Sequence, residues 1–126
     1  MLKKFAIAIA CFTLAGCGAT YEAPDTAIDT GRQFINATYQ GNFKRANQLI
    51  ESTETNINTL KNRIEADFRS RDGFGKEALS KSSIQIQAIE TLPDKNVKIK
   101  FLNAYTGQKD SLLVLPVGDT WAVRLY

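Results

Sequence analysis

From residue 26 onward, the first half of the chain carries apolar side chains at three- and four-residue spacing, the period of an amphipathic helix. The first stripe predicts a helix that begins after Pro24 and Thr26 and ends before Gly41. It consists of Ala27, Ile28, Gly31, Phe34, Ile35 and Thr38. Asn42 can cap a second, short helix, and the two helices should form a hairpin. The apolar positions of the second helix are Phe43, Ala46, Leu49 and Ile50.

A third helix is predicted from about Thr53, again from apolar residues at helical spacing. Its inward positions are expected to be Ile57, Leu60, Ile64 and Phe68. Gly73 and Gly75 should close this helix and begin a flexible linker that continues to Leu79.

The second half of the chain changes to a two-residue alternation, which is typical of strands with one buried face. A first strand is predicted around Ile84, Ile86 and Ala88, and a turn at 93–96 joins it to a second strand. The inward residues of the second strand are Val97, Ile99 and Phe101. A third strand, 110–117, is joined by a tight turn to a final strand. That final strand places Trp121, Val123 and Leu125 on one face.

Helices followed by an antiparallel meander indicate an α+β domain, in which N-terminal helices pack on one face of a curved antiparallel sheet of about four strands. No repeat or low-complexity segment interrupts the pattern, so residues 26–126 are expected to form a single domain. The 110 residues that follow residue 16 can bury roughly two-thirds of the surface of their unfolded chain. A core of that size needs no disulfide bond.

The residues before this domain have the pattern of an export signal. Lys3 and Lys4 form a cationic start, and the apolar run from Phe5 to Leu14 is about half of the roughly twenty residues that cross a bilayer. Residues 1–16 are therefore predicted to be a signal peptide. The four residues at its end are Leu14, Ala15, Gly16 and Cys17.

These four residues resemble the lipobox of bacterial lipoproteins, in which small residues before a cysteine admit the signal peptidase. The resemblance implies that the peptidase recognises Leu14, Ala15 and Gly16 and that the Cys17 thiol carries diacylglycerol. Residues 17–25 would then be a lipidated cysteine and a short tether. The alternative is an ordinary secretory signal followed by an incidental cysteine.

Lipid attachment would place the protein in a bacterial cell envelope, with a membrane as its first partner. The residue after Cys17 is Gly18 and not an aspartate, which resembles the sorting pattern of outer-membrane lipoproteins. The outer membrane is therefore favoured if the cell is Gram-negative. The six residues from Gly18 to Ala23 reach roughly 20 Å when extended, so the domain should lie close to the lipid headgroups.

Composition argues against several classes of function. The chain has no histidine, and Cys11 leaves with the signal peptide, so Cys17 is the only cysteine of the mature chain. We therefore expect no internal disulfide, no metal site and no cofactor. Loss of Lys3 and Lys4 leaves a nearly neutral domain whose basic cluster is interleaved with acidic residues, so no nucleic-acid surface is expected. The cluster consists of Arg63, Arg69, Arg71 and Lys76.

Two segments resemble small bacterial lipoproteins with a nuclear-transport-factor-2-like domain. The segment from Phe34 to Ala46 resembles their first helical hairpin, and the segment from Leu113 to Val123 resembles their last pair of strands. Together the resemblance covers most of residues 26–126. It implies a cystatin-like cone, in which helices and a bent sheet enclose a pocket. The family includes isomerases, dehydratases, transport adaptors and non-catalytic ligand binders.

An enzyme without histidine needs carboxylates or tyrosines as its acids and bases. Glu90 is the strand carboxylate expected to face inward, and Tyr39 and Tyr105 offer hydroxyl groups. A solvated glutamate and packed tyrosines explain the same residues, so we assign no catalytic residue. The candidate pocket-lining residues are Tyr39, Phe101, Tyr105 and Trp121, and the alternative is that these aromatic side chains pack in the core.

The leading hypothesis is a membrane-anchored, non-catalytic domain that binds a small apolar ligand or an envelope protein. Ligand binding predicts an enclosed apolar cavity of at least a few hundred cubic ångströms. Partner binding predicts an exposed apolar patch on the sheet or the third helix. The alternative is an isomerase-like or hydrolase-like enzyme that uses a carboxylate or a tyrosine in the cone pocket.

Overall fold

The computed structural model describes residues 22–125, and its first helix begins and ends where the apolar stripe predicts. α1 spans Ala27–Tyr39. The Thr26 hydroxyl accepts a hydrogen bond from the Asp29 N–H at 3.0 Å and so caps the first turn. Gly41 has a φ of +73°, a conformation that favours glycine, and there the chain reverses. The predicted first helix is confirmed.

The second helix also has the predicted cap. α2 spans Phe43–Leu49, and the Asn42 side-chain oxygen accepts a hydrogen bond from the Arg45 N–H at 3.1 Å. Ala46 and Leu49 are fully buried. α1 and α2 pack against each other as the expected hairpin.

The third helix is continuous, but its middle is a π-helical turn, wider than an α-helix. Its three parts are α3 (Glu54–Thr59), η1 (Leu60–Glu65) and α4 (Ala66–Ser70). The inward position predicted for Ile57 is wrong, because this side chain is 44% exposed while its neighbour Asn56 is fully buried. The Asn56 amide bonds backbone groups of two other segments, so it takes the inward position. Leu60 and Ile64 then face the core as predicted.

The segment predicted to be a flexible linker is a helix. α5 spans Gly73–Lys81, and the Asp72 carboxylate accepts the Gly75 N–H at 2.7 Å as its cap. Leu79 is buried. The two glycines suggested a loop, but the aspartate cap and the Leu79 contact outweigh their weak helix propensity. None of the helices within residues 22–125 combines the length and apolar character that a membrane span requires.

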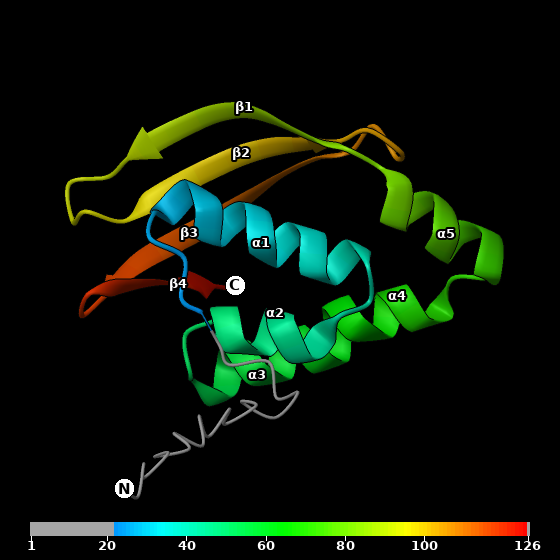
Figure 1. The fold of residues 1–126 in the computed structure, drawn as a ribbon, viewed down its shortest axis with the longest axis horizontal. Coiled ribbons are helices and arrows are strands. Elements are labelled where there is room, and N and C mark those ends of the chain that lie inside the picture. Colours follow the sequence, from blue (N-terminus) through cyan, green and yellow to red (C-terminus); the bar gives the residue numbers. More distant parts are fainter. Residues whose placement is uncertain (1–21, 126) are drawn as a thin grey trace, which may run out of the picture.

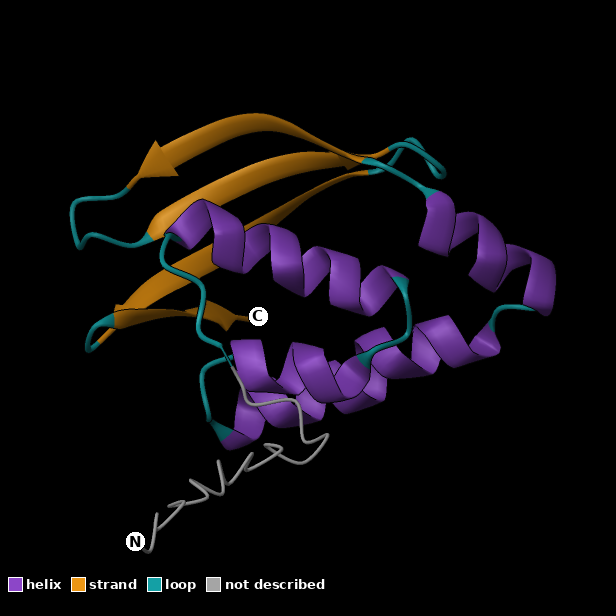
Figure 2. Ribbon diagram, viewed as in Figure 1, coloured by secondary structure: helices purple, strands orange, loops and turns teal. Residues whose placement is uncertain are grey.

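The four predicted strands form one antiparallel sheet in the order of the chain. They are β1 (Ile84–Thr91), β2 (Val97–Asn103), β3 (Lys109–Val117) and β4 (Thr120–Arg124). The sheet curls around α1, with β1 and β2 on one side of this helix and β4 descending toward α2 and α3 (Figure 1). Figure 2 shows the helices on the inner side of this curve. The predicted α+β architecture is confirmed.

A β-bulge in β1 changes which of its residues face inward. Ile86 lies opposite Phe101, but the next paired residue, Ala88, lies opposite Lys100. Ala88 is therefore on the outer face, not the inner face as predicted, and Ile89 takes the inner position opposite the buried Ile99. The same shift places Glu90 opposite Lys98 on the outer face, where it is exposed. The prediction that Glu90 faces inward is wrong.

The core lies between α1 and the sheet, and its closest contact is at Gly31. A Cβ atom at this position would lie 2.6 Å from the Cδ1 atom of Ile99, which is fully buried. Val114 and Leu112 line the same contact. Glycine therefore permits the helix backbone to approach the sheet more closely than any other residue would.

A polar network joins the start of the third helix to the last strand. Ile50 forms an isolated parallel bridge with Val123, and the Glu51 N–H donates to the Val123 carbonyl at 2.8 Å. The Asn56 side-chain amide donates to the Glu51 carbonyl at 3.1 Å, and its oxygen accepts the Leu125 N–H at 2.8 Å. The Glu51 carboxylate accepts two hydrogen bonds from the guanidinium of Arg124, at 2.8 and 3.0 Å.

We predict that Gly31→Val lowers the free energy of unfolding by about 2 kcal/mol, because the added side chain overpacks the contact with Ile99. Urea unfolding followed by circular dichroism measures this change. Gly73→Val is the matched control, because no atom lies within 4 Å of a Cβ at Gly73. An equal loss in both variants would contradict the close approach.

We predict that the Glu51–Arg124 pair makes stability depend on acidic pH. The hydrogen bond from Arg124 lowers the pKa of Glu51 below its ordinary value of 4.5 in the folded protein. The pair therefore stabilises the fold fully above pH 4.5, and this stability is lost as the pH falls through the lowered pKa. Glu51→Gln should cost about 1 kcal/mol at neutral pH and progressively less in acid.

The measurement is urea unfolding of both proteins at a series of pH values. Glu77→Gln, which removes an exposed ion pair with Lys81, is the control and should change stability little. A difference between wild type and Glu51→Gln that stays constant from neutral to acidic pH would contradict the assignment.

Candidate functional site

A cleft of about 910 Å³ opens beside the part of β3 that β4 does not cover. β4 pairs with residues 113–117 of β3, so residues 109–112 have no strand on that side within the described chain. α1, η1, α4 and this uncovered stretch of β3 supply about half of the lining. The cleft is open to solvent, so it is not the enclosed cavity expected for a small apolar ligand.

The inner wall of the cleft is apolar. Side chains from α1, η1, the sheet and the C-terminal end of the chain contribute to it: Phe34, Ile35, Ile64, Phe101, Leu112 and Leu125. Most of them also belong to the core, so the cleft is a continuation of the core to the surface. An apolar group bound there would be removed from water on one side.

One end of the cleft is closed by Phe68 of α4. Its ring packs edge-to-face on Phe43 with ring centroids 5.5 Å apart. A Cβ atom at Gly41 would lie 2.6 Å from this ring, so the glycine lets α4 approach the end of α1. Lys76 lies 5.7 Å from the ring centroid, on α5.

Tyr39 is the central polar group at this end. Burial raises the pKa of Tyr39 above its ordinary value of 10.0, and the negative charge of Asp110 adds to this, against the opposing effects of the Asn103 hydrogen bond and Arg71. The Asn103 side-chain oxygen accepts hydrogen bonds from the backbone N–H groups of Tyr105 and Thr106, at 2.8 and 3.1 Å. The side-chain amide nitrogen of Asn103 is therefore the group that donates to the Tyr39 hydroxyl oxygen. Tyr39 is therefore a neutral phenol.

The charged residues around Tyr39 are mostly engaged with neighbours. Arg71 donates to the Asp67 carboxylate at 3.2 Å, and one Asp110 oxygen accepts the Ser111 N–H at 2.8 Å. Within residues 22–125, the buried Nε atom of Arg71 has no hydrogen-bond partner. The cations Arg71 and Lys76 and the carboxylates Asp67 and Asp110 balance each other at this end of the cleft.

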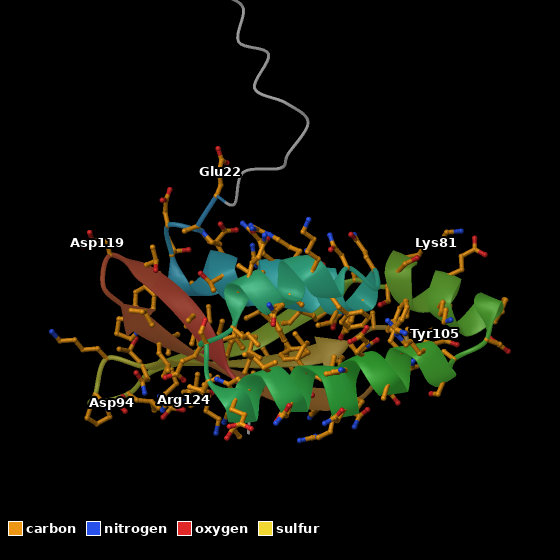
Figure 3. The ribbon with its side chains drawn as sticks, turned by 90° about the horizontal axis from the view of Figure 1, so that it is seen from below. Glu22, Lys81, Asp94, Tyr105, Asp119 and Arg124 are labelled. Carbon is orange, nitrogen blue, oxygen red and sulfur yellow. The ribbon has the colours of Figure 1, made fainter. Side chains whose placement is uncertain are left out.

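Basic side chains also line the cleft, from the outer face of the sheet and from η1. Lys98, Leu113 and Arg124 occupy neighbouring positions on β2, β3 and β4, and all three line the cleft. Arg63 of η1 lines it from the helical wall. In Figure 3, Arg124 and Tyr105 lie toward opposite ends of the molecule, with Arg124 near the start of α3.

The structure brings two of the four predicted pocket-lining residues into the cleft. Tyr39 and Phe101 line it. Tyr105 is outside the lining and 45% exposed, because it follows β2 in the turn that Asn103 stabilises. Trp121 is also outside, since it lies opposite Pro116 at the far end of β4 and packs against the core there.

Sequence reasoning did not identify the charged residues of the cleft. The basic cluster of the third helix was interpreted as a solvated face, which fits Arg69, an exposed partner of Glu65. Arg63 and Arg71 instead line the cleft, together with Asp67. Their four-residue spacing places them on one helix face, which was the available signal.

The cleft does not contain a recognisable catalytic or metal-binding set. Within residues 22–125 no three metal-binding side chains of the histidine, cysteine or carboxylate type cluster together. Leu14, Ala15, Gly16 and Cys17, the predicted peptidase and lipidation residues, lie outside the described residues. No protein family, no curated protein and no solved structure matches the chain.

We predict that Tyr39 of the folded protein ionises above the ordinary tyrosine range and that Tyr39→Phe removes this late titration. Burial of Tyr39 disfavours the phenolate. The measurement is an alkaline titration followed by the ultraviolet absorbance of phenolate. Tyr105→Phe, at an exposed position, is the control and should leave the late titration in place. Loss of the late step in the control variant would contradict the assignment to Tyr39.

Proposed function

We propose that this protein is a bacterial cell-envelope lipoprotein, anchored by a lipid on Cys17, whose domain from residue 26 to 126 binds a small ligand without catalysis. The observation that supports ligand binding is the cleft beside β3, because its volume and its apolar inner wall suit a small molecule. Its open side and charged rim favour a ligand that is partly polar over a wholly apolar one.

A nuclear-transport-factor-2-like cone is part of this proposal. The order of elements supports it, because a helical hairpin and a third helix precede a curved antiparallel meander. Part of the cleft lining comes from α1 and the inner face of the sheet, as a cone pocket would require. The sheet is open at β3, so the pocket is a groove at the edge of the cone.

The proposed anchor is supported by the lipobox resemblance and is compatible with the contacts that Glu22, the first described residue, makes with the domain. Arg45 donates a hydrogen bond to the Glu22 carbonyl at 3.1 Å and also bonds the side-chain oxygen of Gln33. The start of the described chain is therefore held against α1 and α2. The five residue steps from Cys17 to Glu22 span at most about 18 Å. A lipid on Cys17 would keep this side of the domain near the membrane.

The enzyme alternative has one supporting observation, which is that Tyr39, Asp67 and Asp110 line the cleft. Each is poorly suited to acid–base chemistry. The raised pKa of Tyr39 keeps its phenol protonated near neutral pH, so little phenolate is present to act as a general base. Asp67 is paired with Arg71, and Asp110 accepts a backbone hydrogen bond. Binding without catalysis is therefore the better-supported function.

The anchor predicts that intact mass spectrometry of the protein from native membranes shows a chain that begins at Cys17 and carries a lipid adduct. Cys17→Ala should abolish the adduct and release the protein from membranes. Cys11→Ala is the matched control, because this cysteine lies in the predicted signal peptide, and it should leave the adduct intact. An unmodified wild-type chain that retains residues 1–16 would overturn the proposed anchor.

The same preparation tests ligand binding. Organic extraction of the purified protein should release a small molecule in stoichiometric amount. If folded protein purified from native membranes releases no small molecule, binding of a partner protein becomes the better-supported version of the hypothesis. Crosslinking in intact cells would then identify the partner.

A further inference from the structure

The end of the cleft at Tyr39 carries hydrogen-bond donors and acceptors in balanced charge. We propose that this end binds the uncharged polar head of an amphipathic molecule, a hydroxyl or amide group that both donates and accepts hydrogen bonds. The apolar body of the molecule then lies on the inner wall of the cleft. This inference rests on the proposed ligand-binding function and names the chemical class of the ligand.

Three polar side chains reach this end of the cleft from three separate elements. Tyr39 is the last residue of α1, Arg71 follows α4, and Asp110 lies on β3. All three line the cleft. Asp110 and Arg71 are also close enough to the Tyr39 hydroxyl for their charges to act on it. The three side chains therefore belong to one site.

The Tyr39 hydroxyl has a proton to donate to a ligand. The Asn103 side-chain amide donates to the hydroxyl oxygen, and burial keeps the phenol neutral, so its proton is available to an acceptor. Asn103 is itself buried and fixed by its bonds to the turn that follows β2. The donor is therefore held in place before a ligand arrives.

Arg71 and Asp110 have hydrogen-bonding capacity that the described residues leave unused. Arg71 donates from Nη2 to the Asp67 carboxylate at 3.2 Å, and its buried Nε atom has no partner within residues 22–125. One Asp110 oxygen accepts the Ser111 N–H, which leaves the second oxygen for a ligand. A hydroxyl or amide head accepts a hydrogen bond from Tyr39 or Arg71 and donates one to Asp110.

The balance of charge favours an uncharged head. Two cations and two carboxylates lie at this end: Arg71, Lys76, Asp67 and Asp110. A carboxylate or ammonium head would lose part of its hydration here without a net opposite charge to compensate for the loss. A hydroxyl or amide group costs less to remove from water, and hydrogen bonds of the site replace those it gives up.

The apolar wall begins directly beside these polar groups. Phe101 lies opposite Asp110 on the inner face of the sheet, and Leu112 is two residues further along β3 on the same face, about 7 Å away at the rise of a strand. On the helical wall, Ile35 precedes Tyr39 by one turn of α1, which is about 6 Å along the helix axis. An apolar body that extends from the head in this direction contacts Ile35, Phe101 and Leu112.

The test compares four probes that share an octyl or octanoyl chain and differ in the head group. They are octanamide, 1-O-octylglycerol, octanoate and octylammonium. Isothermal titration calorimetry uses the full chain with Cys17→Ser, which removes the predicted lipidation site, and each probe stays below its micelle concentration. We expect the two uncharged probes to bind more tightly than the two ions. The amide and diol arms distinguish an amide ligand from a glyceride-type ligand.

Tyr39→Phe removes the donor of the site without changing its charge. It should weaken binding of octanamide and octylglycerol about fivefold, as expected for the loss of one hydrogen bond. Octylammonium has no acceptor, so its binding should not change. Tyr105→Phe is the matched control, because Tyr105 is exposed and does not line the cleft.

Asp110→Asn tests the balance of charge. The new amide oxygen still accepts the Ser111 N–H, but one negative charge is lost, so octanoate should bind about threefold more tightly. Binding of octanamide should change little. Asp119→Asn is the control, since Asp119 is exposed and lies outside the cleft lining. Circular dichroism of each variant confirms that the fold is retained.

The outcomes separate this inference from the function on which it rests. If all four probes bind equally, or if an ion binds most tightly, the cleft is a ligand site but the inference about an uncharged head is overturned. If folded protein binds none of them, the proposed ligand-binding function also fails. If Tyr105→Phe weakens octanamide as much as Tyr39→Phe does, the head lies elsewhere and the assignment to Tyr39 is wrong.

Discussion

The buried side-chain amide of Asn56 makes the interactions on which the arrangement of the helices relative to the sheet depends. It bonds the Glu51 carbonyl and the Leu125 N–H, so it joins the start of the third helix to the end of the last strand. A buried backbone group that loses its partner costs more than an average hydrogen bond contributes. The third helix therefore cannot move away from the sheet without leaving these groups exposed or without a hydrogen-bond partner. The width of the cleft between η1 and β3 follows from this constraint.

The elements that sequence reasoning predicted are those specified by local interactions. α1 and α2 begin at Thr26 and Asn42, side chains that cap a helix through hydrogen bonds three residues away. The strands follow from alternation on one buried face. The inward position of Asn56 and the bulge of β1 depend on contacts with segments far along the chain, so a periodic pattern could not show them. The helix at Gly73–Lys81 was missed because its glycines masked an aspartate cap.

The cleft was predictable only in part, for the same reason. Phe101 lies on an inward face that periodicity predicts, whereas Tyr39 was a candidate only as an aromatic hydroxyl, and the structure places both in the cleft. The charged rim depends on how a π-helical turn orients Arg63 and on where β4 ends relative to β3. Net charge was misleading as well, because a nearly neutral domain can still gather charged side chains around a cleft. In a cleft, local charge decides which ligand is attracted, while total charge mainly affects solubility.

The uncovered stretch of β3 also affects self-association. The Asn103 N–H donates to the Gln108 carbonyl, so the backbone groups of Gln108 point toward β2. In an antiparallel pair this direction alternates along the strand, so the backbone N–H and C=O groups of Lys109 and Ser111 point toward the open edge. An open edge is a template for a strand of another molecule. The Asp110 carboxylate already accepts the Ser111 N–H, which occupies one of the donors an incoming strand would need. This small intramolecular bond would therefore help to protect the protein from edge-to-edge aggregation.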